Sequence, residues 1–217
     1  LDLLDGDSAS FTGVGNAVDK NVGMDKEVWI TGITGTGPDL DNYTYNATAL
    51  TGVNINQKAI VVDGLGINRA YCGTTIVGVT LMADGILTGD ELAFTGIGNT
   101  ADKNAGMDKA VLISGITGTG TDAGNYSYNT TATTDVDISK KVIVVGAEGV
   151  NRAYDGTTNV DVLLASSGVV TVDNLTFTGV GNTADKNAGD DKAVAVSAIT
   201  GAGTDLANYD FNTTADT

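Results

Sequence analysis

The segment Phe94-Thr95-Gly96-Ile97-Gly98-Asn99 decides how this sequence is organised, because it occurs three times. Near-identical copies lie at 11–16 and 177–182, each 83 residues from the middle copy. Other segments recur at the same spacing: Lys20-Asn21 with Lys103-Asn104 and Lys186-Asn187, Asn42-Tyr43 with Asn125-Tyr126 and Asn208-Tyr209, and Arg69-Ala70-Tyr71 with Arg152-Ala153-Tyr154. No insertion or deletion interrupts the register. The chain is therefore a tandem repeat.

Each repeat is longer than the roughly 20–50 residues of a solenoid or propeller unit and can hold a small core of its own. The apolar run after Val53 matches the run after Val136, which places the boundaries near 52/53 and 135/136. We expect the C-terminal portion of a repeat at 1–52, a complete repeat at 53–135, and a complete or nearly complete repeat at 136–217. These are the first, second and third repeats below. Because the sequence starts inside a repeat, we expect either that it was cut from a longer protein or that a neighbouring molecule supplies the missing strands of this repeat.

Charge and composition limit the function. The formal net charge is −16 and every repeat is acidic, so nucleic acid is not expected as a partner. Histidine, the commonest general base, is absent, which argues against an enzyme. No apolar run reaches the ~18 residues of a membrane span, so no membrane insertion is expected in this segment. The single cysteine, Cys72, cannot form an internal disulfide.

Thirty glycines, one proline and many Thr and Val residues predict an all-β fold of short strands and turns. About seven candidate strands in each repeat favour tandem small immunoglobulin-like β-sandwiches in an elongated array. The alternative is a β-grasp-like unit with a short helix. The β-branched runs at 58–62 and 141–145 read as buried strands.

Alternation along the strands predicts which side chains face the core. Val111 and Ile113 flank Leu112, and the same pattern recurs in the other two repeats. The position of Leu112 is held elsewhere by Trp29 and Ala195, residues whose volumes differ too much for one packed interior site. We expect this position to be exposed or at a contact between repeats. Aromatic residues two apart are expected to share one side of a strand: Tyr43/Tyr45, Tyr126/Tyr128 and Tyr209/Phe211.

The segment Tyr154-Asp155-Gly156-Thr157-Thr158, together with Asp102-Lys103-Asn104-Ala105-Gly106 and Asp122-Ala123-Gly124-Asn125-Tyr126, resembles the YDG-type repeat of large bacterial adhesins and filamentous-haemagglutinin-like surface proteins. The resemblance covers nearly all of each repeat. It implies an exported stalk or spacer module at the bacterial cell surface or in a biofilm matrix, without catalytic residues. The second repeat departs from the pattern, because Tyr71-Cys72-Gly73 replaces the signature Asp.

Recurring aspartates are the candidate ligands for a metal, since Ca²⁺ binds several carboxylate and carbonyl oxygens. Two sets recur at the repeat spacing: Asp7, Asp90 and Asp173, and Asp39, Asp122 and Asp205. Asp2, Asp5 and Asp7 are also close enough in sequence to share an ion. The alternative is that these aspartates close turns and carry surface charge. Apart from Ca²⁺, no cofactor is expected.

The sequence is compatible with two functions. The repeats can act as a mechanical spacer whose partners are the neighbouring repeats of the same chain. Alternatively, the repeats themselves bind, either by homo-association into extracellular fibres or by taking up host or matrix glycans on an exposed aromatic such as Trp29.

Overall fold

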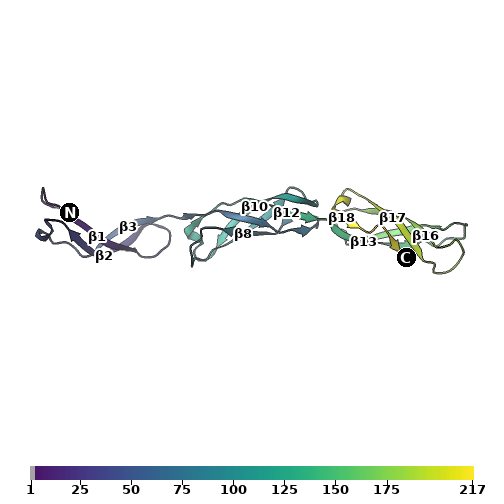
Figure 1. Cartoon of the computed structure of the whole chain (residues 1–217), viewed down its shortest axis with the longest axis horizontal. Coiled ribbons are helices and arrows are strands. Elements are labelled where there is room, and N and C mark those ends of the chain that lie inside the picture. Colours follow the sequence, from purple (N-terminus) through teal and green to yellow (C-terminus); the bar gives the residue numbers. More distant parts are fainter. Residues whose placement is uncertain (1–2) are drawn as a thin grey trace. The chain divides into compact units, whose positions relative to one another are not determined.

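The computed structural model describes residues 3–217, which form an all-β structure with three single-turn 3-10 helices (Figure 1). The all-β prediction is confirmed. The chain divides into two compact units: unit 1 contains the residues up to Val62 together with 83–94 and 118–129, and unit 2 contains 63–82, 95–117 and 130–217. Both units include part of the second repeat. No helix among residues 3–217 is long and apolar enough to cross a membrane.

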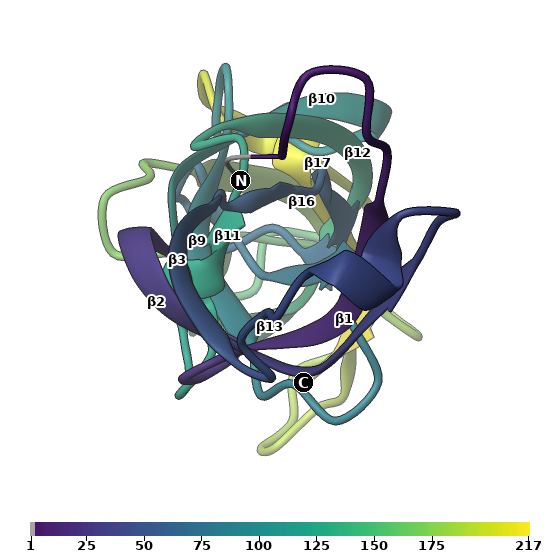
Figure 2. The same cartoon turned by 90° about the vertical axis from the view of Figure 1, so that its left-hand side faces the viewer.

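Unit 1 contains a three-stranded antiparallel sheet in the order β1-β2-β3, formed by Ser10–Ala17, Gly23–Thr36 and Ala49–Ile55 (Figure 2). The same unit contains a second, two-stranded sheet, in which β4 (Lys58–Ala59) pairs in parallel with β11 (Tyr126–Ser127). The 3-10 helices η1 (Leu40–Asn42) and η2 (Ala123–Asn125) each follow an aspartate.

The second repeat contributes a five-stranded sheet in the order β6-β12-β10-β9-β7. Its strands are Arg69–Ala70, Ala132–Ser139, Gly106–Thr119, Ala93–Thr100 and Ile76–Val77. A separate pair joins β5 (Val62–Gly66) to β8 (Val79–Ala83). The predicted repeat boundaries fall inside β3 and β12, so each strand carries residues of two consecutive repeats.

The third repeat, in unit 2, has two sheets, drawn in green to yellow in Figure 1. One has the order β15-β13-β18, formed by Val162–Ser167, Lys141–Gly149 and Tyr209–Phe211. The other has the order β14-β16-β17-β19, formed by Asn159–Val160, Thr176–Thr183, Val194–Ala202 and Ala215–Asp216. The helix η3 (Leu206–Asn208) precedes β18.

The core of the third repeat lies between its two sheets. Val145 of β13 packs with Val194, Val196 and Ile199 of β17, and Leu164 of β15 packs against this cluster. Burying such side chains contributes on the order of 1.5–3 kcal/mol each, which is the main stabilising term of a small repeat. Val194 and Val196 of β17, the equivalents of Val111 and Ile113, are buried, which confirms the prediction that they face the core.

The prediction of fully buried strands at 58–62 and 141–145 is wrong. Ile143 and Val145 are buried, but Val142 and Val144 between them are 76% and 62% exposed. The sheet that contains β13 is covered on one face only, and side chains alternate between the faces of a strand. Valine is enriched in strands in general, including half-buried ones, so a β-branched run alone does not show burial on both sides.

Two other predictions about faces are confirmed. Trp29 and Leu112 are exposed, as is Ala195. Tyr209 and Phe211 turn to the inside of β18 while Asp210 is exposed. Phe211 meets Phe177 edge to face, with 5.2 Å between the ring centroids, and the equivalent pairs are Tyr128 with Phe94 and Tyr45 with Phe11.

Candidate functional site

A lysine of the second repeat lies between two aspartates of the third repeat, inside unit 2. Lys103 Nζ is 2.7 Å from Asp173 Oδ1 and 2.8 Å from Asp205 Oδ1. Lys103 lies in the loop between β9 and β10, where the Asp102 carboxylate accepts a hydrogen bond from the Asn104 N–H at 2.8 Å. This local bond fixes the turn, and the turn presents the lysine to the next repeat.

Two tyrosines complete this contact. The hydroxyl groups of Tyr71 and Tyr209 both donate to Asp173 Oδ2, at 2.8 and 2.7 Å. Their rings meet edge to face, and the Lys103 ammonium lies 5.8 Å from the centre of the Tyr71 ring. The Asp173 side chain is 0% exposed. We call these five residues, Lys103, Asp173, Asp205, Tyr71 and Tyr209, the inter-repeat contact.

The electrostatics of the inter-repeat contact favour the ionised pair. Burial alone would raise the pKa of Asp173, but hydrogen bonds from Lys103, Tyr209 and Tyr71 outweigh it and hold that pKa below its usual range. Hydrogen bonds to Asp173 and Asp205 raise the pKa of Lys103. Burial, with the nearby Asp173 carboxylate, raises the pKa of Tyr209 to about 12. At neutral pH the Lys103 ammonium therefore faces the ionised carboxylate of Asp173, and the phenols of Tyr71 and Tyr209 are neutral.

Amide groups beside the ion pair add hydrogen bonds between the two repeats. Asn208 Oδ1 accepts from the Ala105 N–H at 2.9 Å, and Asn208 Nδ2 donates to Asn104 Oδ1 at 3.1 Å. Asn208 itself is buried. The Asn208 side chain thus forms hydrogen bonds with both the backbone and a side chain of the Lys103 loop. These two bonds fix the orientation of the loop as well as its position.

The equivalent contact of unit 1 joins the first and second repeats with the same residue types. Lys20 Nζ is 2.6 Å from Asp90 Oδ1 and 2.8 Å from Asp122 Oδ1, and the Tyr126 hydroxyl donates to Asp90 Oδ2 at 2.6 Å. The amide pair recurs as well, because Asn125 accepts from the Val22 N–H and donates to Asn21.

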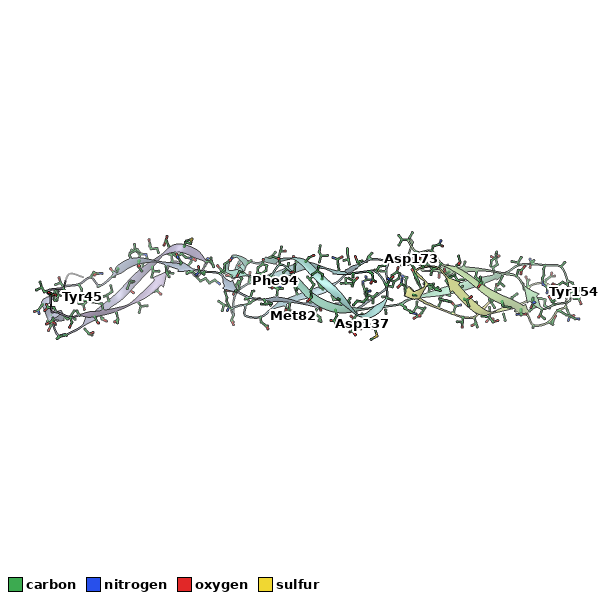
Figure 3. The ribbon with its side chains drawn as sticks, turned by 90° about the horizontal axis from the view of Figure 1, so that it is seen from above. Tyr45, Met82, Phe94, Asp137, Tyr154 and Asp173 are labelled. Carbon is green, nitrogen blue, oxygen red and sulfur yellow. The ribbon has the colours of Figure 1, made fainter. Side chains whose placement is uncertain are left out.

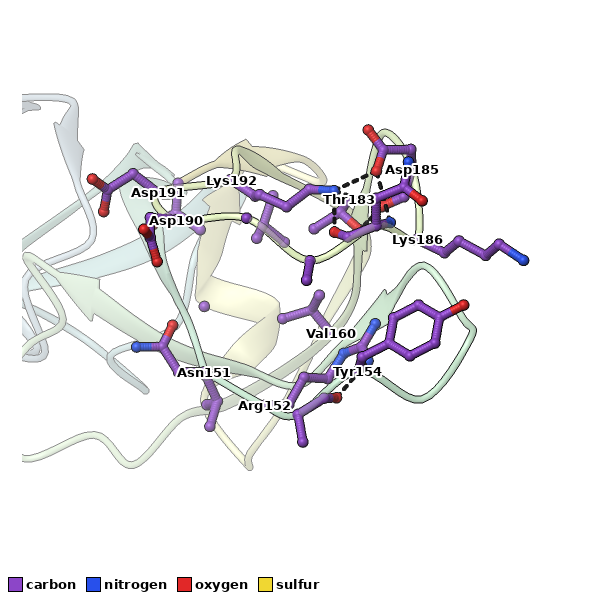
Figure 4. A pocket seen from close by; sticks show the side chains of 18 of the residues that line it. Asn151, Arg152, Tyr154, Val160, Thr183, Asp185, Lys186, Asp190, Asp191 and Lys192 are labelled. Carbon is purple, nitrogen blue, oxygen red and sulfur yellow. Dashed lines mark hydrogen bonds and ion pairs between the residues drawn. The ribbon is translucent and has the colours of Figure 1, made fainter.

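Tyr154 and Asp173 lie at opposite ends of the third repeat (Figure 3). Tyr154 is the counterpart of Tyr71, yet it is 62% exposed whereas Tyr71 is 1% exposed. Around Tyr154 is an open pocket of about 980 Å³, lined by 148–154 and by the loop that carries Lys186 and Asn187 (Figure 4). The burial of Tyr71 therefore comes from the following repeat and not from its own.

The Tyr-Asp-Gly motif has a structural explanation in the third repeat. Asp155 accepts hydrogen bonds from the Thr157 N–H at 2.9 Å and pairs with Arg152 at 2.5 Å, while Gly156 adopts a φ of 81°. The Asp and Gly thus close a turn that presents the Tyr. In the second repeat Cys72 replaces the Asp, and Arg69 donates to Cys72 Sγ at 2.9 Å.

The structure pairs the aspartates that the sequence singles out as metal ligands. Asp90 lies with Asp122, and Asp173 with Asp205, each pair around a lysine. In the first repeat Asp7 accepts from the Tyr43 hydroxyl at 2.6 Å and Asp39 accepts from the Ser8 N–H. Among residues 3–217 no three Asp, Glu, Cys or His side chains come together as a metal site. Asp2 lies outside the described residues, and calcium binding stays a prediction.

Sequence reasoning missed Lys103 and Tyr71 as functional residues. Both were visible as recurring positions, but a recurring lysine and a recurring aspartate do not reveal that they meet across a repeat boundary. The signal available was the shared 83-residue spacing of Lys20, Lys103 and Lys186 with the aspartate pairs. Opposite charges that recur together in an acidic chain are candidates for mutual contact.

These observations define a class of protein: an all-β chain of tandem repeats that dock on one another through a buried Lys–Asp–Tyr contact. Residues 56–134 and 138–217 each match the YDG domain, and the chain belongs to the YDG domain family. No curated protein and no solved structure matches the sequence.

Proposed function

We propose that these repeats form the structural stalk of a secreted bacterial adhesin or biofilm-matrix protein. Each repeat would be an immunoglobulin-like sandwich in an elongated array, extracellular or at the cell surface. The observation that carries the proposal is the inter-repeat contact, in which a fully buried carboxylate of one repeat is satisfied by the lysine and tyrosine of the repeat before it.

A spacer needs length and resistance to bending, and it needs no catalytic group. A linker with few contacts lets neighbouring domains rotate freely. Here an ion pair, an aromatic pair and two amide hydrogen bonds join the second and third repeats within unit 2. Bending at this point would expose the Asp173 carboxylate or break its hydrogen bonds, which costs free energy.

The test measures bending directly. Negative-stain electron microscopy of the whole chain gives the distribution of angles between the second and third repeats. We expect a narrow distribution for the wild type and a broad one for the double variant Tyr71→Ala, Lys103→Met. The matched control is Tyr154→Ala, Lys186→Met, which changes the same positions in the third repeat and leaves the contact intact. A wild type as flexible as the double variant would overturn the spacer proposal.

A second candidate is self-association into fibres or binding of matrix glycans. Trp29 favours it, because its ring is exposed beside the equally exposed Leu50 on the neighbouring strand of the unit 1 sheet. Exposed aromatic and apolar side chains are common features of binding surfaces. Ordered polymers under the electron microscope, or specific spots on a glycan array that disappear with Trp29→Ala, would support this candidate. Isolated particles at every concentration would exclude the fibre.

A further inference from the structure

The inter-repeat contact has the geometry of a reactive site as well as of an ion pair. Lys103 Nζ lies 2.7 Å from Asp173 Oδ1, so the amine is already against the carboxyl group that it would attack. Two groups held in contact react far faster than the same groups free in solution, because the entropy of bringing them together is already lost. Lysine amines are established nucleophiles in enzymes, where they attack carbonyl carbon atoms.

Asp205 is placed to move the protons. Its Oδ1 is 2.8 Å from Lys103 Nζ, within hydrogen-bond reach of the proton that the amine must lose. Asp205 also contacts no second lysine or arginine within residues 3–217. It can therefore act as a general base toward Nζ and then as a general acid toward the departing oxygen.

The two tyrosines are placed to stabilise the charge that develops. Both hydroxyl groups donate to Asp173 Oδ2, and neither contacts Oδ1. The two oxygens of the carboxylate are thus different: Oδ1 faces the amine and Oδ2 faces two fixed donors. Two donors aimed at one oxygen in a buried place are the arrangement that stabilises a tetrahedral oxyanion. Oδ2 would remain as the carbonyl oxygen of the product.

We propose that Lys103 and Asp173 form an amide bond between the second and third repeats, a self-catalysed covalent cross-link within the chain. An Nζ–Cγ bond forms and the Cγ–Oδ1 bond breaks. The ammonium gives up two of its three protons through Asp205, both go to Oδ1, and one water leaves. The reactants are an ammonium and a carboxylate and the products are a neutral amide and water, so no outside oxidant, reductant or energy source takes part.

This cross-link does not depend on the proposed function. It would place a covalent bond across a repeat boundary, closing a loop between residues 70 apart in sequence. Lys20 and Asp90 meet in the same way in unit 1, but within residues 3–217 Asp90 receives one tyrosine hydroxyl, and its side chain is less buried than that of Asp173. The proposal is therefore made for Lys103 and Asp173.

Mass spectrometry of the fully denatured chain tests the proposal. We expect the wild type, once its mass no longer changes on incubation, to be one water lighter for each cross-link. An aspartate that cyclises onto the glycine after it, as at Asp63-Gly64, also loses one water. The cross-linked residues are therefore identified from tryptic peptides and not from the total mass alone. Trypsin does not cut at an acylated lysine, and the expected product is the peptide 70–109 joined to the peptide 153–186. Free peptides ending at Lys103 in full yield would overturn the proposal.

Two variants separate chemistry from folding. Lys103→Arg keeps the positive charge and the contact with both carboxylates but has no amine, so it is expected to fold and to show no joined peptide. Asp205→Asn keeps the shape of the side chain and removes the base, and is expected to slow cross-linking by roughly 10²-fold or more. Cross-linking of Asp205→Asn at the wild-type rate would rule out its role as a proton carrier.

Discussion

The rings of Tyr71 and Tyr209 meet edge to face, with 5.5 Å between their centroids and 77° between their planes. Tyr71 belongs to the second repeat and Tyr209 to the third, and both hydroxyl groups donate a hydrogen bond to the same buried oxygen, Asp173 Oδ2. Aromatic pairs in this geometry contribute about 0.5–1.5 kcal/mol beyond their burial. The contact therefore couples the stability of consecutive repeats.

Replacing Tyr71 with alanine is expected to destabilise the chain by about 3–5 kcal/mol, since the variant loses a buried ring and a hydrogen bond to a buried carboxylate. Tyr154→Ala is the control, because the same position is exposed in the third repeat and its change should stay within about 0.5 kcal/mol. The midpoint of urea unfolding measures both. Equal effects of the two substitutions would contradict the assignment of Tyr71 to the inter-repeat contact.

Replacing Lys103 with methionine leaves the carboxylates of Asp173 and Asp205 facing each other without a cation. Breaking a buried ion pair on one side costs about 3–5 kcal/mol, and we expect a loss of that order in urea unfolding. Lys186→Met should be nearly neutral, because Lys186 has no ion pair among the described residues. Lys103→Arg isolates the charge when it is compared with Lys103→Met, since neither variant can form the cross-link and only the arginine keeps the cation. If arginine were as damaging as methionine, charge would not be the cause.

The sequence alone predicts the tandem repeat, the all-β class and the inward faces of the strands, because these depend on spacing and on local alternation. Val111 and Ile113 are buried while Leu112 is exposed, as alternation requires. A β-branched run such as 141–145 indicates a strand but not how many of its faces are covered, so the exposure of Val142 is visible only in the three-dimensional arrangement.

The inter-repeat contact could not be predicted for a different reason. All three repeats carry the lysine, and two carry the upstream tyrosine, Tyr71 or its counterpart Tyr154, so recurrence does not reveal whether Lys103 pairs within its own repeat or with the next. The recurring aspartates form two sets in the sequence, and their six carboxylates are open to two interpretations there, turn closure with surface charge or calcium binding. Only the three-dimensional structure shows that Lys103 pairs with an aspartate of the following repeat, Asp173, and not with one of its own repeat.

Asp102, in the turn that carries Lys103, is expected to titrate at a lower pH than an aspartate in an unfolded peptide. Hydrogen bonds from Lys109 and from the Asn104 N–H hold the pKa of Asp102 below its usual value of about 4. The folded-state pKa is thus lower than the unfolded one, so this bonding stabilises the fold above about pH 4 and is lost as the pH falls through the lowered pKa. Carboxyl NMR titration should place the Asp102 midpoint below that of an unfolded peptide, and Lys109→Met should raise it. An unchanged midpoint in Lys109→Met would contradict this cause.

Calcium removal gives a further test. Because the ammonium of Lys103 already lies between Asp173 and Asp205, we expect the same melting temperature in EDTA and in millimolar Ca²⁺. A ligand that binds only the folded state raises the melting temperature by mass action. A rise with Ca²⁺ that Mg²⁺ does not reproduce would support the calcium reading of the recurring aspartates, and its loss in Asp7→Asn or Asp39→Asn would locate the ion in the first repeat.

The second and third repeats differ at the middle position of the Tyr-Asp-Gly motif, where Cys72 stands in place of Asp155. Asp155 accepts hydrogen bonds from the Thr157 backbone and hydroxyl and pairs with Arg152, whereas Cys72 offers its counterpart Arg69 only a sulfur atom. Sulfur is a weak acceptor, and a carboxylate in the same turn would accept a charge-assisted hydrogen bond.

Cys72→Asp is therefore expected to stabilise the second repeat by roughly 0.5–1.5 kcal/mol, the net value of a typical hydrogen bond. The reciprocal substitution, Asp155→Cys, should destabilise the third repeat by a similar amount. Thermal unfolding of both variants beside the wild type measures the pair. The exposed side chain of Cys72 leaves space for the carboxylate, so a destabilised Cys72→Asp would show that the turn of the second repeat does not follow that of the third.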